Sequence, residues 1–244
     1  RWSCADGAGP GTPCELTVGA LTVGTGSAVF AVRVDDVVPG GVDEISNTVE
    51  INDDGIEFDP AAPVVPSTDS ATVDTPLGAS PQVEITKDDG GISVNPGQRY
   101  AYRIGYRNAG NQAATGVILT ETVPDDTLFS AAASAPSVWS CRDGSPPGTV
   151  CTLFVGLFPA AEPEREARFG LQVLFPARAG LELLFNEVQI EDDGSNSPQP
   201  LTDRGEDVTP LIALPDLVID KRADVQIVEE GDTIIYTLAY SNVG

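Results

Sequence analysis

Short runs in which apolar and polar residues alternate follow one another along the chain, separated by clusters of Gly, Pro, Asp and Asn. Alternation with a period of two is typical of strands that bury one face, and the intervening residues favour turns. Long runs rich in Ala, Leu, Glu and Lys, which would favour helices, are absent from the sequence. The pattern therefore predicts an all-β fold.

The same motifs recur in the same order. Segment 2–14, which begins Trp-Ser-Cys and ends on a second cysteine, recurs at 139–151. The other matching pairs are 47–55 with 186–194, 75–77 with 209–211, 83–87 with 217–221, and 102–110 with 236–244. A repeat of about 135 residues suits a β-sandwich of seven or more strands. We therefore predict tandem immunoglobulin-like antiparallel β-sandwich repeats.

One copy of the repeat is complete, at 80–214. Residues 1–79 correspond to the C-terminal part of a preceding copy with its linker, and 215–244 to the N-terminal strands of a following copy. Half a sandwich cannot bury a core, so we expect either that the chain continues in both directions or that neighbouring subunits complete the halves. The acidic, Pro-rich stretches 59–81 and 195–215 are interpreted as extended connectors.

Seven strands are expected in the complete copy, with short turns that favour a Greek-key sandwich. They are predicted near 82–87, 99–107, 115–123, 136–141, 150–157, 167–176 and 183–190.

Composition excludes several functions. The formal net charge of −24 repels nucleic acid and anionic lipid. The sequence has no histidine, which removes the commonest general base, so an enzyme is not expected. No apolar run reaches the roughly 18 residues that span a bilayer, and no signal-peptide pattern begins the sequence. Any export signal or anchor is therefore expected to lie outside it.

The four cysteines form two pairs with equal spacing, Cys4 with Cys14 and Cys141 with Cys151. Neither the spacing nor the lack of histidine suits a zinc site. We predict two local disulfides, and hence an extracellular or cell-surface location, because disulfides persist in oxidising compartments.

Three motifs follow one another near the end of the chain: Asp-Leu-Val-Ile-Asp-Lys at 216–221, Val to Thr at 228–233, and Tyr-Thr-Leu-Ala-Tyr-Ser-Asn-Val-Gly at 236–244. The complete copy adds Gly-Val-Ile-Leu at 116–119, Glu-Thr-Val-Pro at 121–124 and a late Asn-x-Val strand at 186–188. Across the whole chain this order resembles the bacterial and archaeal surface repeats called domain of unknown function eleven. The resemblance implies immunoglobulin-like domains with structural or adhesive roles.

Lys87 and Lys221 are the only lysines, and they occupy one position of the repeat. Alternation places Lys87 on the face of Val83 and Ile85, so its amine points inward. By the same test Glu121 and Asn186 point inward on later strands. Burial of three such polar groups is costly unless they serve a purpose.

A lysine, an asparagine and a buried acid are what an intramolecular isopeptide bond requires, and the set resembles the isopeptide domains of bacterial pilins and adhesins. We predict a bond from Lys87 to Asn186 assisted by Glu121, with Asn47 and Lys221 bonding to partners outside the sequence. The alternatives are a buried Lys-Glu ion pair with Asn capping a turn, or a lysine that reaches solvent at the sheet edge.

Acidic residues gather at both expected connectors. Hard oxygen ligands at a domain junction suit calcium, although neither run matches the helix-loop-helix calcium motif. A solvated acidic linker is the alternative, and no other cofactor is expected. The candidate ligands are Asp53, Asp54, Asp69, Asp192, Asp193 and Asp203.

These features predict a structural repeat of an extracellular filament, stalk or surface layer, with copies of itself as partners. The first alternative is an adhesin module that binds a glycan or protein, in which Trp2 and Trp139 could stack on a sugar instead of packing in the core. A non-catalytic accessory domain of a secreted enzyme is a third hypothesis.

Overall fold

The computed structural model describes residues 1–53, 55, 66–195 and 200–243. These residues contain twelve strands and one short helix, and the chain divides into two units, Arg1–Asp35 and Asp36–Gly244. Within the described ranges, no helix has the length and apolar character needed to cross a membrane. The predicted all-β class is confirmed.

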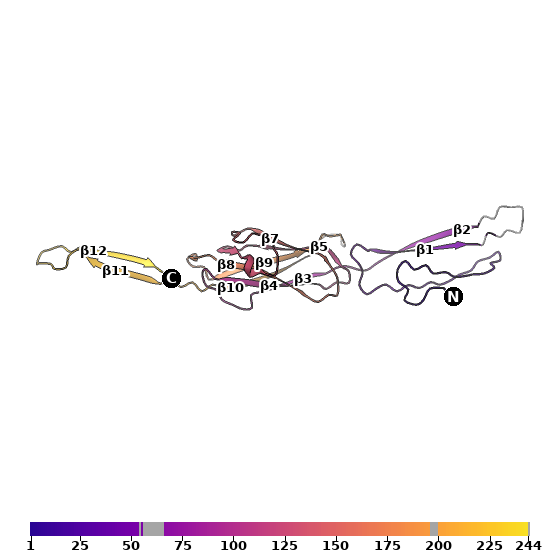
Figure 1. Ribbon diagram of the computed structural model, residues 1–244, viewed down its shortest axis with the longest axis horizontal. Coiled ribbons are helices and arrows are strands. Elements are labelled where there is room, and N and C mark those ends of the chain that lie inside the picture. Colours follow the sequence, from indigo (N-terminus) through magenta and orange to yellow (C-terminus); the bar gives the residue numbers. More distant parts are fainter. Residues whose placement is uncertain (54, 56–65, 196–199, 244) are drawn as a thin grey trace. The chain divides into compact units, whose positions relative to one another are not determined.

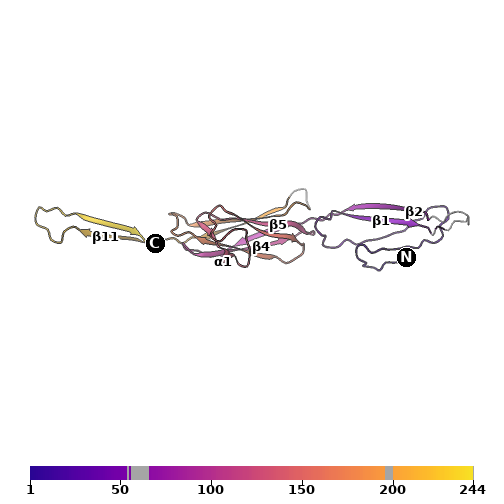
Figure 2. The same cartoon turned by 45° about the horizontal axis from the view of Figure 1, so that its top comes forward.

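Eight strands of the second unit form a sandwich of two antiparallel sheets (Figures 1 and 2). They are β3 (Val83–Asp88), β4 (Arg99–Asn108), β5 (Ala114–Thr122), β6 (Thr127–Phe129), β7 (Val150–Phe158), β8 (Arg165–Val173), β9 (Leu183–Glu191) and β10 (Thr202–Pro210). One sheet has the order β3-β4-β8-β6 and the other β10-β9-β5-β7. β3, β4 and β8 thus share one sheet, and β5, β9 and β10 share the other. This is the arrangement of an immunoglobulin-like sandwich, to which β6 and β7 add one strand in each sheet. The predicted sandwich is confirmed.

The core lies between the two sheets and draws on both. Fully buried side chains include Tyr102 and Phe169 from the first sheet, and Leu119 and Ile190 from the second. Alternation along each strand sends every second side chain inward, where the two inner faces pack together. A single hydrophobic cluster results, and it positions the polar residues described below.

The prediction that 59–81 and 195–215 are extended connectors is wrong, because each stretch contains a strand. β10 lies within 195–215 and pairs with β9, and β2 (Thr68–Pro76) lies within 59–81 and pairs with β1 (Glu44–Asn52). Proline content favoured a connector, but Pro76 and Pro210 are the last residues of their strands, where a missing N–H is tolerated. The last strand of the sandwich, β10, was therefore missed.

The strand predicted at 136–141 is also wrong. This segment has no regular structure, and it follows β6 and the helix α1 (Ala131–Ser134), neither of which was predicted. Ser130 caps the helix by accepting a hydrogen bond from the Ala133 N–H. Trp139 of this segment is buried while Val138 is exposed, so the segment anchors a loop through Trp139 and does not extend a sheet.

The edge strands β3 and β10, which belong to different sheets, lie beside each other. The Asp203 carboxylate accepts a hydrogen bond from the Ile85 N–H at 2.9 Å, and Asp207 accepts one from the Asp89 N–H at 2.6 Å. Between them Gly205 approaches the backbone of Lys87 so closely that a Cβ would lie 3.1 Å from its nitrogen. Side-chain carboxylates thus cap one outer N–H group of β3 and the N–H group of the residue that follows the strand.

Two further hairpins share the register of the sandwich strands. In the β1-β2 pair Asn47 lies opposite Val73, as Asn186 lies opposite Asp207 in β9-β10. β11 (Leu217–Ala223) pairs with β12 (Tyr236–Asn242) so that Leu217 faces Asn242, and Val83 faces Asn108 in β3-β4. Motifs that match in sequence therefore occupy matching places in their strand pairs.

Candidate cross-linking site

Lys87 lies on β3 with its side chain fully buried. Inward and outward positions alternate along this strand, with Val83, Ile85 and Lys87 buried and Thr86 exposed. The amine therefore continues the apolar row of the strand into the core, as predicted. Because Lys87 is inside the sandwich, its ammonium form loses the water that would stabilise it.

Glu121 on β5 contacts the lysine from the opposite sheet. Its Oε1 atom forms a hydrogen-bonded ion pair with Lys87 Nζ, and its side chain is also fully buried. β3 and β5 are not neighbours in any sheet, so the contact crosses the core. Sequence alternation identified the inward face of Glu121, and the packing of the two sheets brings it to Lys87.

Asn186 completes the group from β9, the neighbour of β5. Glu121 lies opposite Val188 in this strand pair, and Asn186 is the preceding inward residue of β9, only 3% exposed. Its amide is near enough to Glu121 to help lower the pKa of that carboxyl. Yet neither Asn186 Nδ2 nor Glu121 Oε2 has a hydrogen-bond partner of normal geometry among the described residues.

Burial shifts the pKa values of both ionisable groups toward their uncharged forms. It raises the pKa of Glu121 to about 7, although the attraction of Lys87 lowers it in part. It lowers the pKa of Lys87, although Glu121 opposes that shift. Desolvation is the first cause in both cases, because the low-dielectric core penalises a charge on either group.

Two aromatic rings pack against the Lys87 amine. Lys87 Nζ lies 4.4 Å from the ring centroid of Tyr102 and 5.6 Å from that of Phe169. The hydroxyl oxygens of Tyr102 and Thr209 are 2.8 Å apart, and Thr209 donates to Asp89 Oδ2 at 2.7 Å. This hydrogen-bonded chain fixes the Tyr102 ring against the lysine.

Tyr102 was missed as a site residue by the sequence analysis. The available signal was its recurrence as Tyr236 in the repeat. Lys221 Nζ lies 4.0 Å from the Tyr236 ring centroid, the same pairing as Lys87 with Tyr102. Lys221 on β11 and Asn47 on β1 are both exposed, and their bonds to partners outside the sequence stay predictions.

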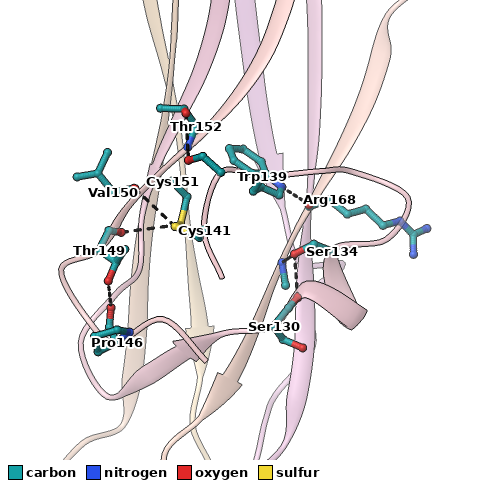
Figure 3. The surroundings of a disulfide bond; sticks show 12 residues. Ser130, Ser134, Trp139, Cys141, Pro146, Thr149, Val150, Cys151, Thr152 and Arg168 are labelled. Atoms are coloured by element: carbon teal, nitrogen blue, oxygen red, sulfur yellow. Dashed lines mark hydrogen bonds between the residues drawn. A yellow bond between two sulfur atoms is a disulfide. The ribbon is translucent and has the colours of Figure 1, made fainter. Parts of the chain in front are cut away.

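Both predicted disulfides are confirmed, Cys4–Cys14 and Cys141–Cys151, and Figure 3 shows the surroundings of the second. Beside the second, the Trp139 indole N–H donates to the Arg168 carbonyl at 2.7 Å. The ring of Trp139 packs edge-on against Phe169, with centroids 5.0 Å apart, and the residue is buried. The core interpretation of Trp139 is therefore confirmed.

The same arrangement occurs around the first disulfide. The Trp2 indole N–H donates to the Val29 carbonyl at 2.7 Å, and its ring lies 5.0 Å from that of Phe30. Val29 and Phe30 follow the same pattern as Arg168 and Phe169 in the complete copy. Neither tryptophan therefore offers its indole N–H to a ligand.

Most described carboxylates of the predicted calcium set hold turns or a strand edge. Asp53 Oδ1 accepts from the N–H groups of Gly55 and Ser67. Asp192 Oδ1 accepts from those of Gly194 and Leu201, the same turn in the complete copy. Asp-Asp-Gly is thus a turn motif that repeats, with its first aspartate as the cap.

The remaining members have other roles. Asp193 Oδ1 accepts from the Thr115 hydroxyl, Asp203 caps β3, and Asp69 accepts from the Ser70 N–H. Asp54 lies outside the described residues.

Where side chains are described, three acidic residues converge at one place, with carboxylate oxygens within 4.8 Å, and they are Asp88, Asp89 and Asp207. None of the three belongs to the predicted set, although Asp203 of that set lies on β10 with Asp207. Calcium binding at the predicted residues stays a prediction.

No protein-family model and no curated protein matches the sequence. Among solved structures, the chain is similar to the major pilin subunit BcpA of Bacillus cereus, with 12% identity and a TM-score of 0.46 over 80% of this chain and 71% of that one.

Two further similarities are weaker. The full-length major pilin SpaD from Corynebacterium diphtheriae has 14% identity and a TM-score of 0.33 over 64% of this chain and 40% of that one. A family 123 glycoside hydrolase from Clostridium perfringens has 8% identity and a TM-score of 0.32 over 55% and 27%. These similarities thus include two pilins and a glycoside hydrolase.

Proposed function

We propose that this chain is a structural module of an extracellular or cell-surface assembly, whose sandwich is locked by an isopeptide bond between Lys87 and Asn186. The observation that supports this most strongly is the buried group formed by Lys87, Glu121 and Asn186. A buried ion pair alone seldom stabilises a fold, so a reaction that consumes the amine accounts better for its retention.

The reaction is an amide exchange. The uncharged Nζ of Lys87 attacks the side-chain carbonyl carbon of Asn186, which the protonated carboxyl of Glu121 polarises. Glu121 then takes a proton from the attacking nitrogen and returns one to the leaving Asn186 Nδ2. The C–Nδ2 bond breaks, ammonia departs, and Lys87 and Asn186 are joined by a secondary amide. No oxidant or reductant is required, and Glu121 ends as it began.

The position of Asn186 beside Glu121 supports this assignment, because the carboxyl that pairs with Lys87 can also reach the amide nitrogen that must leave. The raised pKa of Glu121 supports it too, because the acid must be protonated when the amine is neutral. The aromatic wall of Tyr102 and Phe169 excludes water from the reacting groups.

The consequence is mechanical. The bond ties β3 in one sheet to β9 in the other, and it closes most of the domain into one loop. A cross-link that closes a loop of about 100 residues restricts the unfolded chain by on the order of 4–5 kcal/mol. Such a domain resists pulling, heat and proteolysis, which suits a filament, stalk or surface layer.

The reaction occurs once per domain and acts on no external substrate, so we infer a structural protein and not an enzyme. The matching registers of β1-β2 with β9-β10, and of β11-β12 with β3-β4, support tandem repetition. Other copies of the repeat are accordingly the proposed partners.

Intact mass tests the cross-link. We expect the purified chain to be lighter by one ammonia per closed bond, in addition to the hydrogens lost in the disulfides. The Lys87→Met variant should regain that ammonia, whereas Lys221→Met, at the other lysine, should not. An unshifted mass in the unmodified chain would show that the three residues form only an ion pair and a neighbouring amide.

A further inference from the structure

The loop that precedes the sandwich contacts the turn between β4 and β5. The Val38 N–H donates to the Asn111 carbonyl at 3.0 Å, and the Ala113 N–H donates to the Val38 carbonyl at 3.1 Å. Val38 and Gln112 form a parallel β-bridge and are 6% and 2% exposed. Segment 38–42 is therefore bound to the sandwich through its backbone.

A glutamine side chain adds a clamp to this bridge. Gln112 Nε2 donates to the Val42 carbonyl at 2.8 Å and to the Pro39 carbonyl at 3.2 Å. Its own backbone carbonyl accepts from Asn108 Nδ2 at 2.8 Å, which fixes the turn. The Gln112 amide thus binds two backbone carbonyls of segment 38–42. These two hydrogen bonds depend on the backbone conformation of the segment and not on its side chains.

The same backbone shape recurs at the other end of the sandwich. Gly41 and Gly180 both have positive φ, +79° and +78°. The Leu77 N–H donates to the Asp43 carbonyl at 2.8 Å, and Leu211 donates to the Glu182 carbonyl at 2.7 Å. The match places Ala177 where Val38 lies, Arg178 where Pro39 lies and Leu181 where Val42 lies.

In the second loop, residues 177–182, the N–H group that corresponds to the bridging N–H of Val38 is available. Val38 N–H has a partner on the sandwich, but Ala177 N–H makes no hydrogen bond among the described residues. A surface pocket is formed directly beside it by residues 178–183. The loop therefore offers the donor and the carbonyl geometry that the first loop uses, and the pocket gives access to them.

We propose that residues 177–182 are a docking surface for the Asn-Gln-Ala turn of a following copy of the repeat, the counterpart of 111–113. The turn would bridge to Ala177, and its glutamine amide would donate to the carbonyls of Arg178 and Leu181. Successive sandwiches would then meet through a hydrogen-bonded joint that resists bending. This inference rests on the tandem repetition within the proposed function and does not require the isopeptide bond.

The test extends the full chain. Because 236–244 match 102–110 in register, a second copy of residues 111–214 joined directly after residue 244 continues the repeat. We expect hydrogen exchange at the Ala177 amide to slow by at least about tenfold relative to the unextended chain. In the extended chain, Gln112→Ala placed in the second copy should reverse most of that protection, whereas Gln189→Ala there should not.

Unchanged exchange at Ala177 beside a folded second copy would overturn the proposal. If the second copy does not fold, hydrogen exchange in the unextended chain still tests the proposal. There, Gln112→Ala should speed exchange at Val38 and Ala113 by about tenfold, and unchanged rates would show that the glutamine clamp does not form a joint. Intact mass reads the isopeptide bond independently, so either hypothesis can fail without the other.

Discussion

Lys87 and Glu121 contact each other across the core of the sandwich, from strands that belong to different sheets. Both side chains are fully buried, and burial shifts the pKa values of both toward their uncharged forms. Asn186 lies beside Glu121, and its amide nitrogen has no hydrogen-bond partner of normal geometry among the described residues. This one contact between two sheets supplies the amine and the acid that an amide exchange needs.

Glu121→Gln should prevent the cross-link while leaving the size of the core unchanged. Glutamine cannot shuttle the proton from Lys87 to the departing nitrogen, so the chain should keep the ammonia that the unmodified protein loses. Intact mass and peptide mapping measure this. Glu187→Gln, on the same strand as Asn186 but facing outward, should still cross-link. A cross-linked Glu121→Gln chain would contradict the assigned role.

Without the cross-link, the stability of the sandwich should fall as pH rises from about 4.5 to about 7. The folded state holds the Glu121 proton in this window, because its pKa is raised to about 7, whereas the unfolded state releases it. In an Asn186→Ala background we expect a loss of about 2–3 kcal/mol, measured by urea unfolding at the two ends of the window.

The double variant Asn186→Ala/Glu121→Gln is the control for that experiment. It has the same ionisable groups as Asn186→Ala except the Glu121 carboxyl, so its stability should change less between pH 4.5 and 7. If the free energy of unfolding changed equally with pH in the two variants, groups other than Glu121 would cause the pH dependence.

Gly205→Val should separate β10 from β3. Even a Cβ at this position lies 3.1 Å from Lys87 N and from Thr86 C, and backbone atoms cannot move aside easily. We expect a loss of about 1–3 kcal/mol in the free energy of unfolding, measured by denaturant titration. Glu206→Val on the same strand points outward and should cost much less. A neutral Gly205→Val would show that the two edges are looser than described.

Asn108→Ala should be among the most destabilising polar substitutions. Its Oδ1 accepts from the N–H groups of Gln82 and Gly110, and its Nδ2 donates to the carbonyls of Gln112 and Phe158. Loss of these four bonds in a buried setting should cost about 2–4 kcal/mol. Thermal unfolding against Asn95→Ala, an exposed asparagine, measures the difference, and similar melting temperatures would contradict it.

Replacing both Cys141 and Cys151 by Ser should lower the stability of the sandwich by about 2–3 kcal/mol, because the bond closes a short loop. Urea unfolding followed through Trp139 fluorescence measures this in a Trp2→Phe background. Cys4 and Cys14 lie in the other unit, so the same replacement there should leave the unfolding of the sandwich unchanged. Equal effects of the two replacements would contradict the local role of each disulfide.

Much of the site could be predicted because alternation is a local property of a strand. Val83, Ile85 and Lys87 share a face whatever the rest of the fold does, and the same holds for Glu121 and Asn186 on their strands. The disulfides were also predictable, since each joins cysteines close in sequence. The edge strand β10 was not, because its aspartates, Gly205 and final Pro210 are typical of a connector when its neighbour β3 is unknown.

The sequence by itself determined the recurring motifs, the all-β class, and which polar side chains point inward, because these follow from spacing along the chain. Only the tertiary structure decided which inward residues meet. Lys87, Glu121 and Asn186 come together because the strand order stacks β3 over β5 and β9, and the wall of Tyr102 is fixed through Thr209 on β10. Such contacts depend on distances across two sheets, and no periodicity within one strand specifies them.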